Sequence, residues 1–549
     1  MGEPAVLGVE RSLTGRRWTW RYGPPAASGG GAPAGLSDLS AALLRARGGP
    51  DADLGRLAAP RLRDWLPAPG ALLDLERAAE RLADAVMAGE RIAILGDYDV
   101  DGATSTALLT RFLRALGAPP LIHIPDRMRE GYGPNTPALA ALADQGARIV
   151  ITVDCGAQAF EPLAAARALG LDVIVADHHQ CADALPGAYA FVNPNRRDQG
   201  AGLGHLAAVG VCFLLAAATA RALRERGGFD ARPAPDLLAL LDLVALGTVA
   251  DVVPLTTLNR AFVAQGLKVM ARRGNAGLAA LMAVAGVDGA PDAGTLGFRL
   301  GPRVNAGGRV GEAGLGARLL ATDDPGEAAG IAAQLDRLNA ERRTIEALVL
   351  DQAMAQAEAQ ADAPIVVVHA TGWHPGVLGI VAGRLKEATS RPAIVIDADS
   401  GKGSGRSIAG VDLGAAVAAA RDAGLLAVSV TGTPALGTSQ FTPLRVATLQ
   451  QQISGGFASD STALGAGTLS FRFGGAINAE RLSRLQARIV AGGANNQLAT
   501  PDMDEGLRGR GVLYAPDYVI NAAGVISVGL EILNQWSDAE MTRRIDAIG

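Results

Sequence analysis

The fold is decided by Arg91-Ile92-Ala93-Ile94-Leu95-Gly96, which runs directly into Asp97-Tyr98-Asp99-Val100-Asp101-Gly102. Two later stretches repeat this form: Ile149-Val150-Ile151-Thr152-Val153 runs into Asp154, and Val173-Ile174-Val175-Ala176 runs into Asp177-His178-His179. Short β-branched runs followed by helical patterns predict parallel strands of an α/β domain. Ligands of such sheets bind beyond the carboxyl ends of the strands, so these aspartates and histidines are expected to meet at one site.

The aspartates are spaced so that several of them can face one crevice. Asp99 and Asp101 alternate along the chain, and Gly102 is expected to allow a tight turn before a helix that starts near Thr104-Ser105-Thr106. A fourth segment supplies Asp251, which follows an apolar run that we interpret as another strand. A single aspartate at a strand end usually caps a helix, but four such segments in one chain favour a functional site.

Crowded carboxylates and imidazoles are unfavourable unless a cation neutralises them, so the pattern predicts a metal site. Carboxylates with one or two imidazoles suit Mn²⁺, with Mg²⁺ as the alternative, and zinc is less suited without thiolates. Two such ions about 3.5–4 Å apart can activate water and stabilise the leaving oxygen of a phosphodiester. The sequence therefore predicts a two-metal hydrolase.

The composition is that of an α/β protein with several domains. The chain has 549 residues, 49% of them hydrophobic, with three cysteines that lack paired spacing and favour a reducing cytoplasm. No uncharged apolar run reaches the ~20 residues of a membrane span, and no secretory signal is expected. Because the net charge is −5, nucleic-acid binding would need a local basic groove together with bound metals.

The sequence divides into six segments that differ in charge and periodicity. One is a connector helix, expected because leucines at heptad-like spacing mix with charged residues. Another is expected to be poorly ordered, because Arg445 and Asp460 are the only charged residues between Leu425 and Phe471. The segments are an N-terminal arm with its linker (1–71), a doubly wound, mainly parallel sheet that carries the aspartates (72–323), a connector helix (324–362), a small α/β domain (363–424), a low-charge linker (425–472) and a partial Rossmann-like segment (473–549).

Six motifs together make the chain similar to a known family. They are Gly96-Asp97-Tyr98-Asp99-Val100-Asp101-Gly102, Val153-Asp154-Cys155-Gly156, Asp177-His178-His179, Asn193-Pro194-Asn195, Ala250-Asp251-Val252-Val253-Pro254 and Gly301-Pro302-Arg303-Val304-Asn305-Ala306-Gly307-Gly308-Arg309. The set resembles the RecJ exonucleases of the DHH phosphoesterase family, and the likeness covers roughly residues 10–424. It implies digestion of single-stranded DNA from the 5′ end to mononucleotides with Mn²⁺ or Mg²⁺, and a role in DNA repair and recombination.

The resemblance also implies roles for individual residues. Asp154 would bridge two metal ions, Asp97 would support the first of them, and His179 would lie near the scissile phosphate. Asp97 and His179 are therefore the candidate catalytic residues. The candidate metal ligands are Asp99, Asp101, Asp154, His178 and Asp251.

Several arginines and one Gly-rich segment are candidates for substrate binding. Arg127 resembles a phosphate-contacting arginine of the family, as does either Arg303 or Arg309. Trp373-His374-Pro375-Gly376 and Gly403-Ser404-Gly405-Arg406-Ser407 resemble the accessory DHHA1 domain, in which Ser404, Gly405 and Arg406 would close over the terminal nucleotide. Without the resemblance, each arginine could equally form a surface ion pair.

The sequence departs from the family after Gly424. The resemblance implies a Gly-Gly-Gly-His segment that completes DHHA1 and an OB-fold that grips the strand, and neither follows here. A sheet without its last strand would expose an edge, so impaired activity is expected.

Residues 473–549 are similar to the C-terminal part of the leucine/phenylalanine/valine dehydrogenases. The likeness rests on Gly474-Gly475-Ala476-Ile477-Asn478 and on Tyr514-Ala515-Pro516-Asp517-Tyr518-Val519-Ile520-Asn521. Half a dinucleotide fold cannot seat a pyrophosphate on a helix N-terminus, so no dehydrogenase activity is expected. Out-of-frame coding sequence between Leu425 and about Phe471 would explain such a chimera, and another reading frame of the gene should then encode Gly-Gly-Gly-His.

Two further functions remain open. The same chemistry could act on short oligonucleotides or small phosphoesters, or the chain could be an inactive chimeric binding protein. The resemblance implies single-stranded DNA as the main partner, with a single-strand-binding protein and a helicase as further partners, and no membrane partner is expected.

Overall fold

The chain forms two compact units, Met1–Ala447 and Thr448–Gly549. All the candidate site residues lie in the first unit. None of the described helices is long and apolar enough to span a membrane. The structure, a computed structural model, describes residues 53–127, 129–230, 233–414 and 416–417, with residues 36–46, a few positions before residue 20 and three short strands after residue 437.

Five parallel strands form the main sheet and position the aspartates. In spatial order they are β2 (Leu121–His123), β1 (Ile92–Gly96), β3 (Ile149–Val153), β4 (Asp172–Ala176) and β5 (Ala190–Val192). The last residues of β1, β3 and β4 pair side by side. The next residues on these strands are Asp97, Asp154 and Asp177, so the register alone brings three carboxyl groups to one edge of the sheet.

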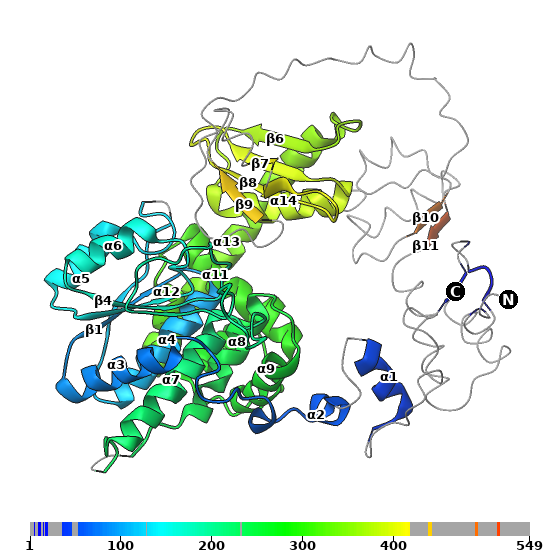
Figure 1. Ribbon diagram of the computed structural model, residues 1–549. Helices are drawn as coiled ribbons and strands as arrows, with labels where there is room; N and C mark the ends of the chain where they lie inside the picture. The colour runs from blue at the N-terminus through cyan, green and yellow to red at the C-terminus, as the bar shows by residue number, and fades with distance from the viewer. Residues whose placement is uncertain are drawn as a thin grey trace. The chain divides into compact units, whose positions relative to one another are not determined.

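Helices cover both faces of this sheet, which confirms the doubly wound fold (Figure 1). One face packs on α3 (Leu75–Ala88), α4 (Val100–Ala115) and α7 (Ala208–Glu225), behind which lies α8 (Leu241–Ala250), and the other packs on α5 (Thr136–Asp144) and α6 (Phe160–Ala168). Alternate strand residues serve the two cores: Ile92 and Ile94 point to the first, and Ala93 and Leu95 to the second.

Further helices complete the domain that contains the main sheet, and one of them leads to the small domain. The connector helix is α13 (Pro325–Glu358), whose N-terminus Asp324 caps by accepting from the backbone N–H groups of Gly326 and Glu327. The other elements are α1 (Asp38–Ala46), α2 (Leu54–Ala58), η3 (Leu62–Asp64), η4 (Leu237–Leu240), α9 (Thr257–Met270), α10 (Ala276–Val284), the π-helical turn η5 (Thr295–Leu300), α11 (Gly301–Val310) and α12 (Leu315–Ala321).

The small domain has a four-stranded sheet, where a missing final strand was expected. Its strands, in order, are β6 (Val366–Ala370), β7 (Ala393–Asp397), β8 (Gly403–Arg406) and β9 (Thr438–Phe441), with α14 (Pro375–Thr389) packed on them. β9 pairs antiparallel with β8, so the sheet does not end at β8, contrary to the expectation of an exposed edge left by a missing last strand. Most of 425–472 lies outside the described residues. In the second unit, β10 (Ile489–Ala491) pairs parallel with β11 (Leu513–Ala515).

Two local expectations are also wrong. The helix after β1 begins at Val100, with Asp99 as its N-cap, and Gly102 lies inside it. Gly102 is needed for close packing instead of a turn, because a Cβ there would lie 2.5 Å from the carbonyl oxygen of Asp97. Asp251 follows the helix α8 and not a strand, since a short buried apolar run fits either element.

The last turn of α11 packs backbone against backbone on two sides. A Cβ at Gly308 would lie 2.6 Å from the carbonyl oxygen of Tyr98, in the loop after β1. A Cβ at Gly376, at the start of α14, would clash with the carbonyl of Arg309. Glycine at both positions therefore lets α11 touch the aspartate loop and the small domain directly.

Candidate functional site

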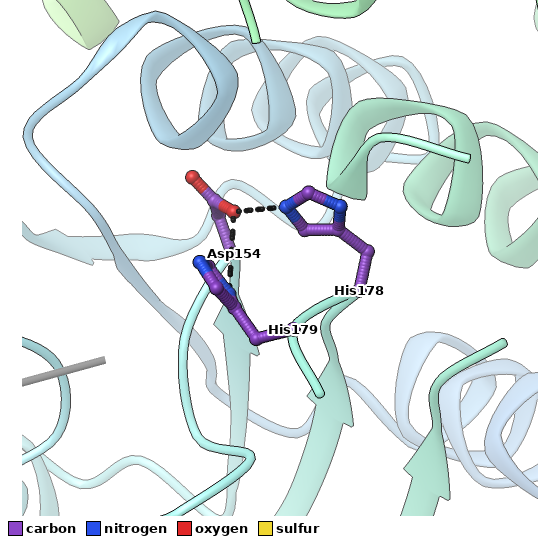
Figure 2. Close-up of side chains that lie close together, drawn as sticks. All are labelled: Asp154, His178 and His179. Atoms are coloured by element: carbon purple, nitrogen blue, oxygen red, sulfur yellow. Dashed lines mark ion pairs between the residues drawn. The ribbon is translucent and has the colours of Figure 1, made fainter. Parts of the chain in front are cut away.

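Side chains from four separate segments converge at the carboxyl edge of the main sheet. The Nε2 of His178 lies 3.3 Å from Asp154 Oδ1, 3.6 Å from Asp251 Oδ2 and 3.8 Å from Asp101 Oδ2. Figure 2 shows Asp154 facing both histidines, with His179 Nδ1 at 3.9 Å from the same oxygen. The structure thus brings the predicted metal ligands and His179 together.

Three sets of side chains have ligand atoms close enough to share a metal ion, all within 4.8 Å of one another in each set. Asp154 belongs to two sets, and so does His178, as expected for residues between two ions. The sets are Asp97, Asp99 and Asp154; Asp101, His178 and Asp251; and Asp154, His178 and His179.

Unpartnered carboxylate oxygens show that the site fits cations. Asp97 Oδ1, Asp154 Oδ1 and Asp251 Oδ2 are buried and have no hydrogen-bond partner among the described residues. A buried polar atom without a partner is costly, and a buried charge more so, unless a counter-charge satisfies it. Carboxylate oxygens together with one or two imidazole nitrogens are suitable ligands for Mn²⁺. Mg²⁺ prefers oxygen ligands, so it suits the carboxylates of this set better than the imidazoles.

Asp99 and Asp101 have a second task, which is to hold helix ends in place. Asp99 Oδ1 accepts from the backbone N–H groups of Asp101 and Gly102 at 2.9 and 3.1 Å. The two carboxylate oxygens of Asp101 accept from the first N–H groups of α7, those of Ala208 at 2.6 Å and Val209 at 2.9 Å. Helix N-termini stabilise the negative charge of these side chains.

Mutual proximity and burial keep protons on the carboxyl groups while no cation is bound. Burial, and then the neighbouring charge of Asp99, raises the pKa of Asp101 to about 7. Burial, and then the charge of Asp101, raises the pKa of Asp251 to about 9 and holds the pKa of Asp154 well above its usual range. The pKa of Asp97 is raised well above its usual range by burial and then by Asp99. A metal must displace these protons when it binds.

The two histidines have opposite charge states. Burial and the charge of His179 lower the pKa of His178 to about 4, so His178 is neutral, as a metal ligand must be. Burial would also lower the pKa of His179, but the carboxylate of Asp177 outweighs it and raises that pKa to about 9. Asp177 accepts from His179 Nδ1 at 2.7 Å, which leaves Nε2 as the ring atom free to meet a substrate.

Asp177 lies within the candidate site, and the sequence alone suggests no individual role for it. Burial alone would raise the pKa of its carboxyl group, but the charge of His179 and its hydrogen bonds lower the pKa below the usual range. It accepts three backbone N–H groups besides the His179 ring, those of Ala157, His178 and His179. Asp177 therefore shapes the loop that presents both histidines.

Tyr132 is a second residue that reasoning from the sequence left without a role. Its hydroxyl donates to the carbonyl oxygen of Asp154 at 2.7 Å. Its ring packs edge-on against the ring of His179, with the centroids 6.0 Å apart. Its place in Glu130-Gly131-Tyr132-Gly133, beside Arg127, was the available signal.

Arg127 lies close enough to Arg309 and Arg406, and to Asp97, for its charge to affect their pKa values, and we call the three arginines the arginine pocket. Burial, and then the charge of Arg127, lowers the pKa of Arg309 to about 10. The same two causes lower the pKa of Arg406 and that of the adjacent His374. Within the described part of the chain, none of the three arginines forms an ion pair with a carboxylate. A cluster of unpaired cations fits a strongly anionic ligand.

The candidate substrate residues differ in where the structure places them. Arg406 donates to Ser404 Oγ at 3.2 Å and to the carbonyl of Gly405 at 2.8 Å, so β8 presents these residues as one group. Arg309 donates to the carbonyl of Gly376 at 3.1 Å. Arg303 turns away, because its Nε pairs with Asp336 on α13 at 2.8 Å. Of the two arginines that were left open, the geometry places Arg309 at the pocket.

Comparison with known proteins assigns the class first. The description "DHH family, N-terminal domain" matches residues 91–248, and "DHHA1 domain" matches residues 362–424. These two regions hold most of the metal ligands and the β8 group described above, so the chain has the DHH–DHHA1 architecture.

Individual relatives then give the family. The single-stranded-DNA-specific exonuclease RecJ of Escherichia coli is 40% identical over 395 residues, covering 69% of this chain and 68% of the relative. That of Bacillus subtilis is 39% identical over 393 residues, covering 70% of this chain and 48% of the relative. The chain belongs to the RecJ family, and it spans between 48% and 68% of the length of the curated RecJ proteins that it matches.

Solved structures agree with this assignment. RecJ from Thermus thermophilus in complex with Mn²⁺ has a TM-score of 0.61 at 35% identity, covering 74% of this chain and 56% of that chain. An exonuclease RecJ bound to manganese has a TM-score of 0.57 at 36% identity, covering 68% of this chain and 90% of that chain.

The C-terminal part has different relatives. The description "Glutamate/Leucine/Phenylalanine/Valine dehydrogenase" matches residues 473–548. The valine dehydrogenase of Streptomyces albus is 56% identical over 59 residues, which is 11% of this chain and 16% of the relative. The chain therefore joins parts of two unrelated families, as its sequence predicts.

Proposed function

We propose that this chain is a metal-dependent exonuclease that degrades single-stranded DNA in the 5′ to 3′ direction and releases mononucleotides. The observation that carries the proposal is the convergence of aspartates with three unpartnered carboxylate oxygens beside an arginine pocket. Membership of the RecJ family supports the substrate, and RecJ structures with Mn²⁺ and with Mg²⁺ support the metals.

Two Mn²⁺ or Mg²⁺ ions would be held, with Asp154 serving both. Asp97 and Asp99 would complete one site, and the other would be completed by Asp101, His178 and Asp251. When bound, the ions supply an activated water and neutralise charge on the scissile phosphate. The protein contributes fixed ligand positions and a dry environment, because Asp101 and Asp154 are almost fully buried.

His179 would act on the leaving group. Asp177 holds a proton on the imidazole and orients the ring, so that Nε2 can donate to the 3′ oxygen released from phosphorus. Tyr132 also holds the ring in place through their edge-on contact. The pair Asp177–His179 thus gives the site an acid that stays charged at pH 7.

The arginine pocket would bind the 5′-terminal phosphate. A terminal monoester carries more negative charge than an internal diester, so Arg127, Arg309 and Arg406 select the end of a strand. Ser404 and Gly405, beside Arg406 on β8, would close over the terminal nucleotide. With the end held there, the first diester bond would lie at the metal ligands, and one nucleotide would be released at a time.

The test is Asp154→Asn in the full chain, assayed with Mn²⁺ on 5′-phosphorylated single-stranded DNA. Asparagine is chosen because Asp154 has φ +59, a backbone conformation that asparagine tolerates and alanine does not. Activity should fall more than about 100-fold, since even the loss of a residue that only hydrogen-bonds to a metal ligand costs about 10–100-fold. Asp323→Asn, at an exposed ion pair with Arg111, is the matched control and should keep full activity.

The position of a label tests the polarity. A 5′ label should leave as a mononucleotide in the first turnover, whereas a 3′ label should stay on progressively shorter fragments. The opposite order would contradict the proposed direction, and undiminished activity of Asp154→Asn would contradict the metal centre. Turnover on fragments of two to four nucleotides, compared with turnover on long strands, separates this function from that of a short-oligonucleotide phosphodiesterase.

A further inference from the structure

The loop that carries Asp251 holds a conformation that its own sequence disfavours. Val252 has φ +62 and Thr257 has φ +40, in the left-handed region where β-branched residues are rare. The side chain of Val252 does not pack, since the residue is 85% exposed. Such backbone persists only where surrounding contacts fix it, and it gathers at functional sites. The contacts that fix this loop must therefore come from its backbone and its neighbours.

Asn259 supplies those contacts. It is fully buried, and its Nδ2 donates to the carbonyl of Pro254 at 3.0 Å and to the carbonyl of His205 at 2.5 Å. The amide orientation follows from the chemistry, because both neighbours are acceptors and only the NH₂ group can donate to both. His205 Nε2 and Thr257 Oγ1 are hydrogen-bonded at 2.8 Å. The segment around His205 is thus tied to Pro254 in the middle of the Asp251 loop and to Thr257 at the end of that loop.

A second asparagine ties the same segment to the histidine loop. Asn195 Nδ2 donates to the carbonyl of His178 at 2.5 Å and to the carbonyl of Gly204 at 3.2 Å. Gly204 and His205 are consecutive, so they stand between two amide clamps. One clamp reaches the loop of His178, and the other reaches the loop of Asp251, whose side chains lie 3.6 Å apart.

We propose that Asn259 and Asn195 are positioning residues that set the separation of Asp251 and His178 through the Gly204–His205 segment. Neither asparagine is a candidate ligand. They would keep Asp251 and His178, two candidate ligands of one ion, at a fixed distance although the backbone of the Asp251 loop is strained. The metal site would therefore be formed before the ion binds. The inference rests on the proposed metal centre, and metal affinity is its readout.

The test compares Asn259→Asp with Asn275→Asp in the full chain. Asn259→Asp replaces a donor by an acceptor that faces two carbonyls, without changing size. Asn275 is a matched buried asparagine, which donates to the carbonyl of Leu320 at 3.1 Å and caps α10, and it belongs to none of the metal-ligand sets. Titration calorimetry with Mn²⁺ should give a dissociation constant about 10–100-fold higher for Asn259→Asp. That of Asn275→Asp should stay within about twofold, although both variants lose stability.

A second measurement and a milder variant keep the test decisive. Hydrogen exchange of residues 251–257 in the metal-free protein should be faster in Asn259→Asp but not in Asn275→Asp. Asn259→Ser retains one donor and serves if Asn259→Asp does not fold, with an intermediate rise expected. Unchanged Mn²⁺ affinity in a folded Asn259 variant would overturn the clamp alone. Absence of Mn²⁺ binding by the unaltered protein would overturn the metal centre and the clamp with it.

Discussion

Asp154 Oδ1 lies 3.3 Å from His178 Nε2, and it is an oxygen to which no described residue donates a hydrogen bond. The carboxyl group of Asp154 also feels the charges of Asp101, Asp99 and Asp97, all of which raise its pKa in addition to burial. Without a cation, this crowding costs stability. The crowding of carboxyl groups therefore lowers the stability of the metal-free protein and favours metal binding.

Asp154→Asn should consequently stabilise the metal-free protein. The buried carboxyl group of Asp154 must take up a proton on folding at neutral pH, whereas asparagine is already neutral, so the free energy of unfolding should rise by about 0.5–2 kcal/mol, the range of other changes that relieve functional strain. Calorimetric melting in a chelator measures it. In Mn²⁺ the order should reverse, since only the unaltered protein gains stability from the metal. A lower melting temperature of the variant in chelator would contradict the crowding argument.

The stability of the metal-free protein should fall as pH rises from about 6.5 to 9. Asp101 and Asp251, with pKa values near 7 and 9, and His179, with a pKa near 9, all keep protons in the folded state that the unfolded chain has released. Groups with raised pKa values stabilise below their unfolded pKa and lose that contribution as pH passes the folded value. The pKa of His178 is lowered to about 4, so its contribution changes only below this window.

Melting temperatures in chelator across this pH range test the expectation. With saturating Mn²⁺ the trend should flatten or reverse, because metal binding requires the deprotonated ligands. Stability that rises with pH in the metal-free protein would show that these protons are not retained.

Asp177→Asn should lower the pKa of His179 and destabilise the protein. The carboxylate of Asp177 is the main cause that keeps the pKa of His179 near 9, so its loss should bring the imidazole below that value. Breaking a buried, hydrogen-bonded charge pair costs about 3–5 kcal/mol. NMR titration of the histidine ring in the metal-free protein, with chemical denaturation in parallel, measures both. An unchanged pKa would remove Asp177 from its proposed role.

Arg309→Gln should weaken binding of strands that carry a 5′ phosphate. Loss of a charged hydrogen bond costs about 1.5–3 kcal/mol, equivalent to roughly a 10- to 100-fold higher KM. Substrates with a 5′ hydroxyl should be affected much less. Arg303→Gln is the matched control in the same helix. Because Arg303 pairs with Asp336, this change should leave the KM for both substrates unchanged. Equal effects of Arg309→Gln on both ends would place the 5′ phosphate elsewhere.

The sequence alone was sufficient to predict the parallel sheet and the meeting of its aspartates at one edge. Three β-branched runs end in the same register, so Asp97, Asp154 and Asp177 had to meet at one edge. Parallel pairing with short crossovers left few alternatives, because βαβ connections have one handedness.

What the sequence could not supply depends on packing between distant segments. The apolar run before Asp251 fits a buried helix as well as a strand, and only packing against α9 decides between them. Whether Arg303 or Arg309 reaches the pocket depends on the rotation of α11 about its axis. The pairing of β9 with β8 and the clamp of Asn259 on His205, 54 positions away, are long-range contacts without a local signal.

The glycine contacts of α11 have a mechanical consequence. On one flank Gly308 lies directly on the backbone of Tyr98, and on the other the backbone of Arg309 lies directly on Gly376. At both contacts the atom nearest to the glycine position is a backbone carbonyl oxygen, which cannot move aside as the end of a flexible side chain can. A displacement of the small domain would therefore be passed through α11 to the Asp97–Asp99 loop, so that the spacing of the arginine pocket and that of the metal ligands are mechanically linked.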